Sequence, residues 1–284
     1  MTGSHGFVGT NLIEMLSPEY EIIRWNARED KALPEVDAVI HLAGLAHDVK
    51  NVNNPELYFK VNTELTKKMY DAFLNSRAKK FIYFSSIKAQ DGDTAYAKSK
   101  KEAEAAILKH EELRVKNHKE VYILRPCMIH GKGVKGNLPL LFKFVKKGLP
   151  WPLAAFENQR SLVSIGNVYY IVDRLLCSDV ESGIYNICDD EAISTNELIR
   201  LICESLGKEP HLLRIPKGLM SGFARLGDVI HLPLNTERFG KLTENYIVDN
   251  SKIKLALRAD LLPVNARDGL RETIQSMING KGNG

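Results

Sequence analysis

The sequence is poor in cysteine, and its cysteines are not grouped. Only four occur in 284 residues, and no two of them form a CxxC pair. They are Cys127, Cys177, Cys188 and Cys203. The eight histidines are also scattered, without the spacing of metal ligands. A disulfide framework and a metal site are therefore not expected, and a reducing cytoplasm is the expected compartment.

The sequence also lacks long hydrophobic runs and an excess of charge of one sign. No apolar stretch approaches the roughly 20 residues that a membrane-spanning helix needs, so no membrane association is expected. The net charge is +4, and the Lys/Arg clusters at 77–80 and 98–101 are short. A nucleic-acid partner is therefore not expected. A mild positive balance suits a phosphate-bearing small ligand, but it also occurs without functional meaning.

The chain does have an ordinary globular composition and a regular alternation of helix and strand patterns. Hydrophobic residues make up 44% of it and charged residues 26%, which is usual for a folded domain. The segment 37–43, DAVIHLA, is almost continuously apolar, as strands buried on both faces are. Strands are expected at 20–25, 37–43, 80–85 and 121–125, and helices at 10–16, 56–76 and 95–110. This alternation predicts an α/β fold with a doubly wound parallel sheet and helices on both faces.

From Pro126 onward the pattern changes to helices separated by loops that contain proline and glycine. These helices are expected near 139–147, 167–177, 195–206 and 217–228. We expect this half partly to return to the sheet and partly to form a small C-terminal domain that covers a substrate.

A glycine-rich loop opens the chain at 2–9, with the sequence TGSHGFVG. Its glycines permit a tight turn and let backbone N–H groups approach a pyrophosphate at the positive end of the following helix. This pattern is typical of dinucleotide-binding folds, where the loop follows a central strand. Here only Met1 precedes Thr2, so we expect the first strand to be truncated.

The residues after the expected strand at 20–25 bear on the choice of cofactor. An NAD site usually has an acidic residue here to accept the ribose hydroxyls. Asn26 aligns best with that position, and Arg24 and Arg28 flank it. Because an arginine at this point can hold a 2′-phosphate, both NAD and NADP stay open.

Tyr96 and Lys100 form a YxxxK pair, which places both side chains on one face of a helix. A free tyrosine has a pKa of about 10, and a neighbouring ammonium favours its phenolate, which brings the tyrosine toward useful acid–base strength. Ser85 and Ser86 end the apolar strand just upstream, at the edge where open α/β sheets bind ligands. Ser86 can hydrogen-bond the reacting carbonyl or alcohol oxygen of a substrate alongside Tyr96. The order of glycine loop, apolar strand, Ser-Ser and YxxxK indicates a catalytic site.

Together these segments resemble the NAD-dependent epimerase/dehydratase family of extended short-chain dehydrogenases/reductases. The motifs that carry the resemblance are TGSHGFVG, DAVIHLAG, KVNTELT, FIYFSSIKA, YAKSKKEAE, ILRPCMIHGKGVKGN, RSLVSIGNV and YNICDDEAIST. The resemblance implies a Rossmann-type core and a Ser–Tyr–Lys mechanism carried by Ser86, Tyr96 and Lys100. It implies a cofactor domain at 1–126, to which 161–190 returns, and a nucleotide-sugar domain at 127–160 and 191–284. The implied cofactor-binding residues are Gly3, Gly6, Phe7, Val8, Gly9, Asn26, Leu42, Ala43, Gly44, Asn62, Tyr96 and Lys100.

The residues that follow Ser86 narrow the reaction. Dehydratases of this family typically carry an Asp-Glu pair just after the catalytic hydroxyl residue, where this chain has Ile87 and Lys88, so a dehydratase is disfavoured. The chain is most similar to enzymes that reduce UDP-4-keto-6-deoxy-N-acetylhexosamines at C4 for cell-surface polysaccharide biosynthesis. A UDP-sugar 4-epimerase is the nearest alternative. A non-catalytic dinucleotide-binding protein is a further one, which the retained Ser–Tyr–Lys set disfavours.

The resemblance also implies residues on the substrate side. Asn137 matches the asparagine that contacts the nucleotide diphosphate, and Arg160 matches the pyrophosphate arginine, a role that suits a cationic donor fork. Lys88 and His47 are expected near the sugar. The expected partner is a nucleotide-diphospho-sugar, UDP in the first place. A homodimer through the helices at 56–76 and 95–110 is expected by analogy.

Overall fold

The computed structural model describes residues 1–28, 32–45, 54–230 and 235–280. Within them the chain forms two compact units, each of which is described by itself. The first unit comprises Met1–Ile129, Ile165–Cys188 and Asp249–Pro263, and the second comprises His130–Ser164, Asp189–Val248 and Val264–Gly284. The units are defined by packing, and the division into a cofactor domain and a substrate domain stays a prediction.

The first unit is built on a parallel sheet. Its strands are β1 (Ala38–His41), β2 (Lys80–Phe84), β3 (Glu120–Pro126) and β6 (Gly183–Ile187), in the order β1-β2-β3-β6. All three neighbouring pairs are parallel. The central strands are buried almost throughout, as their apolar sequences predict. The predicted doubly wound α/β class is confirmed.

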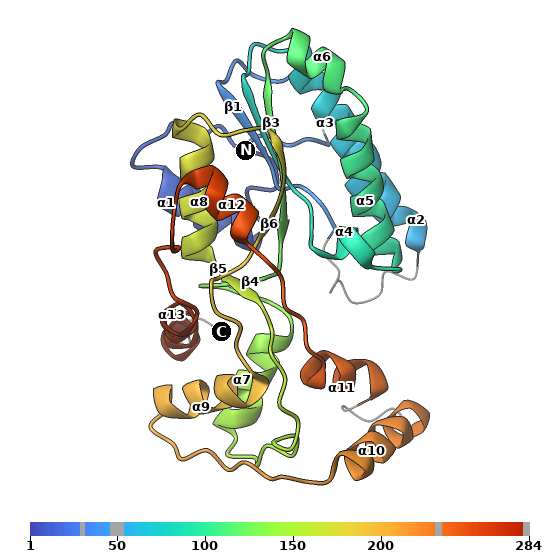
Figure 1. The fold of residues 1–284 in the computed structure, drawn as a ribbon, viewed down its shortest axis with the longest axis vertical. Helices are drawn as coiled ribbons and strands as arrows, with labels where there is room; N and C mark the ends of the chain where they lie inside the picture. The colour runs from blue at the N-terminus through green and yellow to red at the C-terminus, as the bar shows by residue number, and fades with distance from the viewer. Residues whose placement is uncertain (29–31, 46–53, 231–234, 281–284) are drawn as a thin grey trace. The chain divides into compact units, whose positions relative to one another are not determined.

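Helices cover both faces of this sheet (Figure 1). The helices α1 (Phe7–Leu16) and α8 (Ile165–Cys177) pack together on one face. The helices α3 (Leu65–Leu74) and α5 (Ala95–Leu108) lie on the other. α5 begins at the cap Thr94, whose hydroxyl accepts a hydrogen bond from the Ala97 N–H. The remaining elements of the unit are α2 (Pro55–Tyr58), the π-helical turn η1 (Phe59–Glu64), α4 (Lys88–Asp91), α6 (Glu111–Lys116) and α12 (Ser251–Leu257).

The expected strand at 20–25 is wrong, because this segment forms no regular strand. Two of its backbone hydrogen bonds join it to Met1: the Met1 amine donates to the Ile23 carbonyl, and the Trp25 N–H donates to the Met1 carbonyl. The next residue, Thr2, donates instead to the Ile40 carbonyl of β1 at 3.0 Å. Since adjacent residues of a strand serve opposite neighbours, Met1 alone cannot supply a ladder.

A groove of about 580 Å³ lies beside Met1, between the segment 20–23 and β1. Apolar side chains line much of it, among them Leu16, Ile22 and Val36. Because the Ile40 carbonyl accepts from Thr2, the Ile40 N–H faces the same edge and points toward this groove. We therefore expect the groove to accept one more parallel strand that runs into Met1.

A four-residue β-branched extension ahead of Met1 is expected to raise the melting temperature by several degrees. The extension would bury apolar side chains, each worth about 1.5–3 kcal/mol before the loss of chain entropy is subtracted. Thermal unfolding measures the gain, and a Gly/Ser extension of equal length is the control. Equal melting temperatures for the two extensions would show that the groove does not accept a strand.

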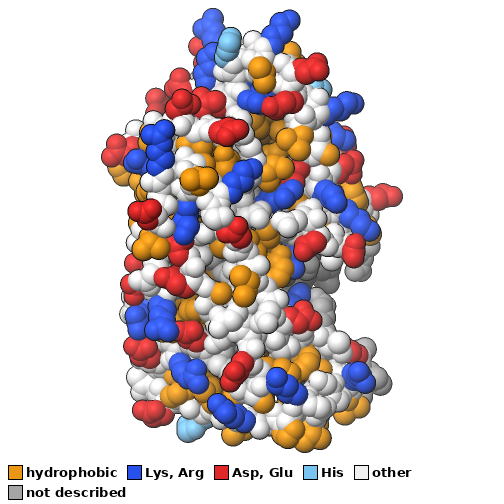
Figure 2. All heavy atoms as spheres, in the orientation of Figure 1, with side chains coloured by type: hydrophobic (Ala, Val, Ile, Leu, Met, Phe, Trp, Pro, Cys, Tyr) orange, Lys and Arg blue, Asp and Glu red, His pale blue; other side chains and the backbone are white. Residues whose placement is uncertain are grey.

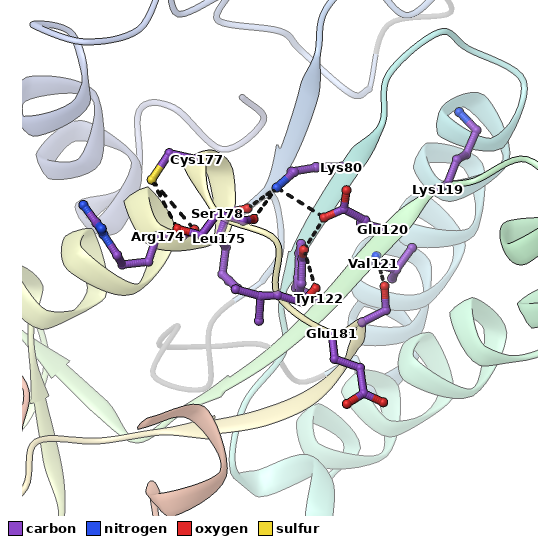
Figure 3. Close-up of polar contacts among 12 residues, drawn as sticks. Lys80, Lys119, Glu120, Val121, Tyr122, Arg174, Leu175, Cys177, Ser178 and Glu181 are labelled. Atoms are coloured by element: carbon purple, nitrogen blue, oxygen red, sulfur yellow. Dashed lines mark hydrogen bonds and ion pairs between the residues drawn. The ribbon is translucent and has the colours of Figure 1, made fainter. Parts of the chain in front are cut away.

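Polar contacts fix the amino edge of the sheet, as Figure 3 shows. The Lys80 ammonium donates to the Leu175 and Ser178 carbonyls at 2.9 and 2.8 Å and lies 3.2 Å from the Glu120 carboxylate. The Tyr122 hydroxyl donates to the same carboxylate. Lys80 thus donates hydrogen bonds to carbonyls at the end of α8 and places a positive charge at the C-terminal end of that helix. These contacts stabilise the sheet at the edge opposite the predicted site.

The second unit is mostly helical. The helix α9 (Thr195–Ser205) packs against α7 (Asn137–Lys146) and α13 (Ala266–Asn279). The short strand of this unit is β5 (Leu162–Ser164), and β4 (Met128–His130) lies where the chain passes from the first unit to the second. The other helices are α10 (Lys217–Ile230) and α11 (Thr236–Thr243), which contact each other. The helices expected near 139–147, 195–206 and 217–228 are confirmed to within two residues at each end.

The described surface offers no membrane span and shows mixed charge. None of the helices in the described ranges is long and apolar enough to cross a bilayer. On the face drawn in Figure 2, Lys/Arg and Asp/Glu side chains are interspersed. The net charge of +4 is thus not gathered into one broad field on that face.

Candidate active site

The glycine loop folds into a tight turn against the end of β1. Gly3 has a φ of 65°, and a Cβ there would lie 2.7 Å from the Ala43 nitrogen and the Leu42 carbonyl carbon. A Cβ on Gly9 would lie 2.4 Å from the Gly3 oxygen. Gly6 is the N-cap of α1 and supplies no side-chain cap. The first-turn N–H groups of α1 are therefore offered at a surface that side chains leave open, which suits a pyrophosphate.

A buried histidine holds this loop on the sheet. The His41 Nδ1 lies 2.7 Å from the Thr2 hydroxyl, and the Ala43 N–H donates to the same hydroxyl at 3.1 Å. On its other side, His41 Nε2 lies 3.1 Å from the Thr66 hydroxyl, which donates to the Asn62 carbonyl. Since Thr66 gives its hydrogen to Asn62, it accepts from Nε2–H, and Nδ1 accepts from Thr2. Burial lowers the pKa of His41 to about 3, which keeps the ring neutral in this role.

The loop after β1 meets Asn62 and Lys100. The Asn62 side chain is fully buried in the π-helical turn η1. It accepts from the Leu45 N–H at 2.7 Å and donates to the Leu45 carbonyl and the Ser99 hydroxyl at 3.2 and 3.0 Å. A Cβ on Gly44 would lie 3.0 Å from Asn62 Oδ1 and 3.4 Å from Lys100 Nζ. The structure therefore brings Gly44, Asn62 and Lys100 together, beside the glycine loop.

The predicted catalytic residues lie at the carboxyl edge of β2 and on the first turns of α5. Lys100 is buried, and its ammonium donates to the Phe84 carbonyl at the end of β2 at 2.7 Å. Tyr96 lies one turn earlier and half-buried, with its ring edge-on to Tyr58 at 6.0 Å. The Ser86 hydroxyl accepts from the Lys88 N–H at 3.2 Å and keeps its own hydrogen to donate to another oxygen.

Glu104 and Arg125, two residues of this region, were missed in the sequence. The Ser85 hydroxyl donates to Glu104 Oε1 at 2.5 Å, and Arg125 donates to the same carboxylate through Nε and Nη2. Glu104 is 3% exposed. The only sequence signal is spacing, because Glu104 follows Lys100 by four residues, as Lys100 follows Tyr96.

The other predicted residues of the first unit lie at its surface. Asn26 is exposed, and its side chain accepts from the Arg28 N–H at 3.2 Å. Arg24 and Arg28 are exposed as well, so the structure leaves NAD and NADP open. The Lys88 side chain is exposed on α4. His47 lies outside the described residues.

The two predicted diphosphate contacts lie in the second unit. Asn137 is exposed in the first turn of α7, after Gly136 with its φ of 89°. The Arg160 guanidinium donates to the Lys241 carbonyl at the end of α11. The Arg160 backbone is hydrogen-bonded to the Ile193 backbone, which fixes the position of the Arg160 Cα. Both roles in substrate binding stay predictions.

Comparison with known proteins identifies the family and the fold. Residues 1–188 match the NAD dependent epimerase/dehydratase family. The UDP-glucose 4-epimerase of Vibrio cholerae is 29% identical, over 98% of this chain and 94% of that protein. Among solved structures, the UDP-N-acetylglucosamine 4-epimerase from Bacillus cereus has a TM-score of 0.74 at 20% identity, over 98% of both chains. MoeE5 in complex with UDP-glucose and NAD has a TM-score of 0.73 at 18% identity, over 98% of both chains.

The two structural matches establish the shared fold, and the family match extends over more than half of the chain, including the glycine loop and the Ser–Tyr–Lys residues. The chain belongs to the NAD dependent epimerase/dehydratase family and is an enzyme of the extended short-chain dehydrogenase/reductase type.

Proposed function

We propose that this enzyme carries out oxidation and reduction at C4 of a nucleotide-diphospho-sugar, and that the net reaction is 4-epimerisation. One observation carries the proposal: the Lys100 ammonium is held on the Phe84 carbonyl, against Gly44 and one turn from Tyr96. This supports the proposal that Tyr96 transfers the proton and that Lys100 is its cation, at the edge of the sheet where open α/β folds bind ligands.

The residues present fit a nicotinamide dinucleotide. The glycine loop leaves a cradle that a Cβ at Gly3 or Gly9 would fill, and the first turn of α1 offers N–H groups to the pyrophosphate. Gly44, Asn62 and Lys100, which lie together, are proposed to hold the nicotinamide end. When bound, the nicotinamide would supply the hydride acceptor and donor for C4.

In this proposal the side chains handle the proton. Tyr96 takes the proton of the C4 hydroxyl as the sugar is oxidised and returns a proton as C4 is reduced. Ser86 donates a hydrogen bond to the same oxygen. Burial lowers the pKa of Lys100 to about 8, while the Glu104 carboxylate opposes that shift. Lys100 therefore stays an ammonium at neutral pH and stabilises the Tyr96 phenolate.

The epimerase is proposed ahead of the reductase because the Vibrio cholerae relative and the Bacillus cereus structure are named as UDP-sugar 4-epimerases. A UDP-sugar is proposed as substrate because MoeE5 is known with UDP-glucose and NAD. The 4-reductase for UDP-4-keto-6-deoxy-hexosamines is the second candidate. Lys88 supports it, since the reductases that the sequence resembles carry a lysine at this position after Ser-Ser.

Two assays separate these candidates. The first incubates the enzyme with UDP-glucose or UDP-N-acetylglucosamine and NAD, and follows the C4 epimer by NMR. The second supplies UDP-4-keto-6-deoxy-N-acetylglucosamine with NADH or NADPH and follows nicotinamide absorbance. We expect epimer without net consumption of cofactor. Stoichiometric consumption in the second assay would establish the reductase, and no product in either would contradict both.

The proposed homodimer is a separate question. Leu57 and Leu108, on the helices expected to pair, are 39% and 45% exposed, which is compatible with an interface at this surface.

A further inference from the structure

Glu104 is a buried carboxylate beside the proposed catalytic residues. Its side chain is 4% exposed, on the same face of α5 as Tyr96 and Lys100. Removing a carboxylate from water is unfavourable unless it is paired and hydrogen-bonded. Here the compensation is complete, because donors from two other elements converge on both oxygens.

The donors come from the ends of β2 and β3. Ser85, directly after β2, donates to Oε1 at 2.5 Å. Arg125, near the end of β3, lies 2.9 Å from Oε1 and 3.2 Å from Oε2 through Nε, and 2.5 Å from Oε2 through Nη2. Such a forked pair fixes direction as well as distance. Glu104 therefore ties α5 to the carboxyl edges of two strands.

The contacts of Glu104 fix both the turn that carries Ser86 and the helix that carries Tyr96 and Lys100. Ser85 precedes Ser86 on the chain, so its hydroxyl bond holds the turn that presents the Ser86 hydroxyl. Lys100 lies one helical turn from Glu104 and contacts the same strand end through the Phe84 carbonyl. A shift of α5 along the sheet would move Tyr96 and Lys100 away from Ser86.

We propose that Glu104 is a positioning residue for the Ser86–Tyr96–Lys100 site, which fixes α5 on the strand ends and supports the positive charge of Lys100. This proposal rests on the proposed function for its kinetic consequences, but not for its electrostatic ones.

The surroundings of Lys100 make the electrostatic consequence specific. Glu104 is the carboxylate that raises the Lys100 pKa against the larger effect of burial. From β1, His41 faces it as a neutral ring, since the His41 pKa is about 3. From β2, the Tyr83 ring lies 4.9 Å from the Lys100 ammonium, and burial raises the Tyr83 pKa. Tyr96 lies on the same helix, and Arg125 contributes positive charge beyond Glu104.

Glu104→Gln is therefore expected to lower the pKa of Lys100 below about 8. Lys100 acts as an ammonium, so activity is lost as the pH rises through its pKa, and the alkaline limb moves to lower pH. At pH 8 we expect kcat to fall about tenfold or more, with KM changed less than about threefold. Glu104→Asp keeps the charge and is expected to keep the alkaline limb in place. Glu102→Gln, at a half-exposed carboxylate on the same helix, is the matched control.

Two measurements make the outcome decisive. The first is the pH profile of kcat for the three variants, and the second is the Lys100 pKa from NMR of lysine labelled at Cε. A lower melting temperature for Glu104→Gln with unchanged kcat, alkaline limb and Lys100 pKa would overturn the proposal. If the unaltered enzyme turns over none of the three UDP-sugars in the assays above, the proposed function fails. The Lys100 pKa in Glu104→Gln then still decides whether Glu104 supports the cation.

Discussion

Replacing Tyr96 with phenylalanine is expected to lower kcat by about 10²–10⁴-fold, the range that a positioned acid–base group supplies. The substitution removes only the hydroxyl. The ring that lies edge-on to Tyr58 is retained, so the packing of α5 against α2 is expected to persist. The affinity for NAD and the melting temperature should therefore stay close to those of the unaltered enzyme. Steady-state kinetics, calorimetric NAD titration and thermal unfolding measure the three quantities.

Tyr170→Phe is the matched control for this substitution. Tyr170 lies on α8, which packs on the opposite face of the sheet from α5 (Figure 1). Its ring, which stacks with Arg174, is retained in the variant, and kcat is expected to stay within about twofold. An unchanged kcat for Tyr96→Phe would exclude Tyr96 as the proton-transferring group. A loss of NAD binding in that variant would show that the hydroxyl serves the cofactor site instead.

The sheet could be predicted from the sequence because each buried strand carries its own signal. The segments at 80–85 and 121–125 each carry at least four consecutive apolar or aromatic residues and become β2 and β3 with nearly the predicted bounds. The segment 20–25 is predicted as a strand too, yet it forms none. The difference lies in the strand partners: β2 has a strand on each side, whereas 20–25 has only the short Met1 backbone to pair with among the described residues. The local sequence of a segment does not indicate how many strands will lie beside it in the sheet.

The π-helical turn shows a second limit of sequence patterns. The segment 56–76 is predicted as one helix, and the structure divides it into α2, η1 and α3. A π-turn adds one residue to a helical turn, which a periodicity of 3.6 residues cannot distinguish over so short a stretch. In this turn Asn62 and Thr63 are both fully buried, and both bond to Ser99 of α5. The irregular turn therefore places Asn62 beside Lys100.

The buried polar residues of the site were the hardest to predict. His41 is one polar residue in an apolar strand, and its partners Thr2 and Thr66 lie 39 and 25 positions away in the chain. Glu104 is one of two glutamates two residues apart on α5, and its side chain is 4% exposed while that of Glu102 is 50% exposed. The only local difference is that Glu104, and not Glu102, follows Lys100 by four residues. By contrast, the glycine loop and the YxxxK pair are local patterns, and both could be recognised directly.

Gly9→Ala is expected to weaken NAD binding about 10–100-fold. The added Cβ would lie 2.4 Å from the Gly3 oxygen and 2.9 Å from the Ser4 Cα. Both are backbone atoms of the loop, so relief requires that the turn itself moves away from the helix. Overpacking of this kind is unfavourable by about 1–3 kcal/mol, and about 1.4 kcal/mol corresponds to a tenfold change in affinity. Because the shift displaces the N–H groups that would face the pyrophosphate, the loss should appear in the Kd for NAD as well as in the melting temperature.

Gly222→Ala provides the control, since it makes the same chemical change where nothing lies within 4 Å of the new Cβ. Gly222 lies inside α10, where alanine is favoured over glycine by up to about 1 kcal/mol. This variant is expected to be slightly more stable and to bind NAD normally. The comparison separates two explanations of the glycine loop. If Gly9→Ala binds NAD as Gly222→Ala does, the glycines serve only the packing of α1 and the dinucleotide is held elsewhere. If affinity falls in Gly9→Ala alone, the close approach of the loop to the helix forms the cofactor site.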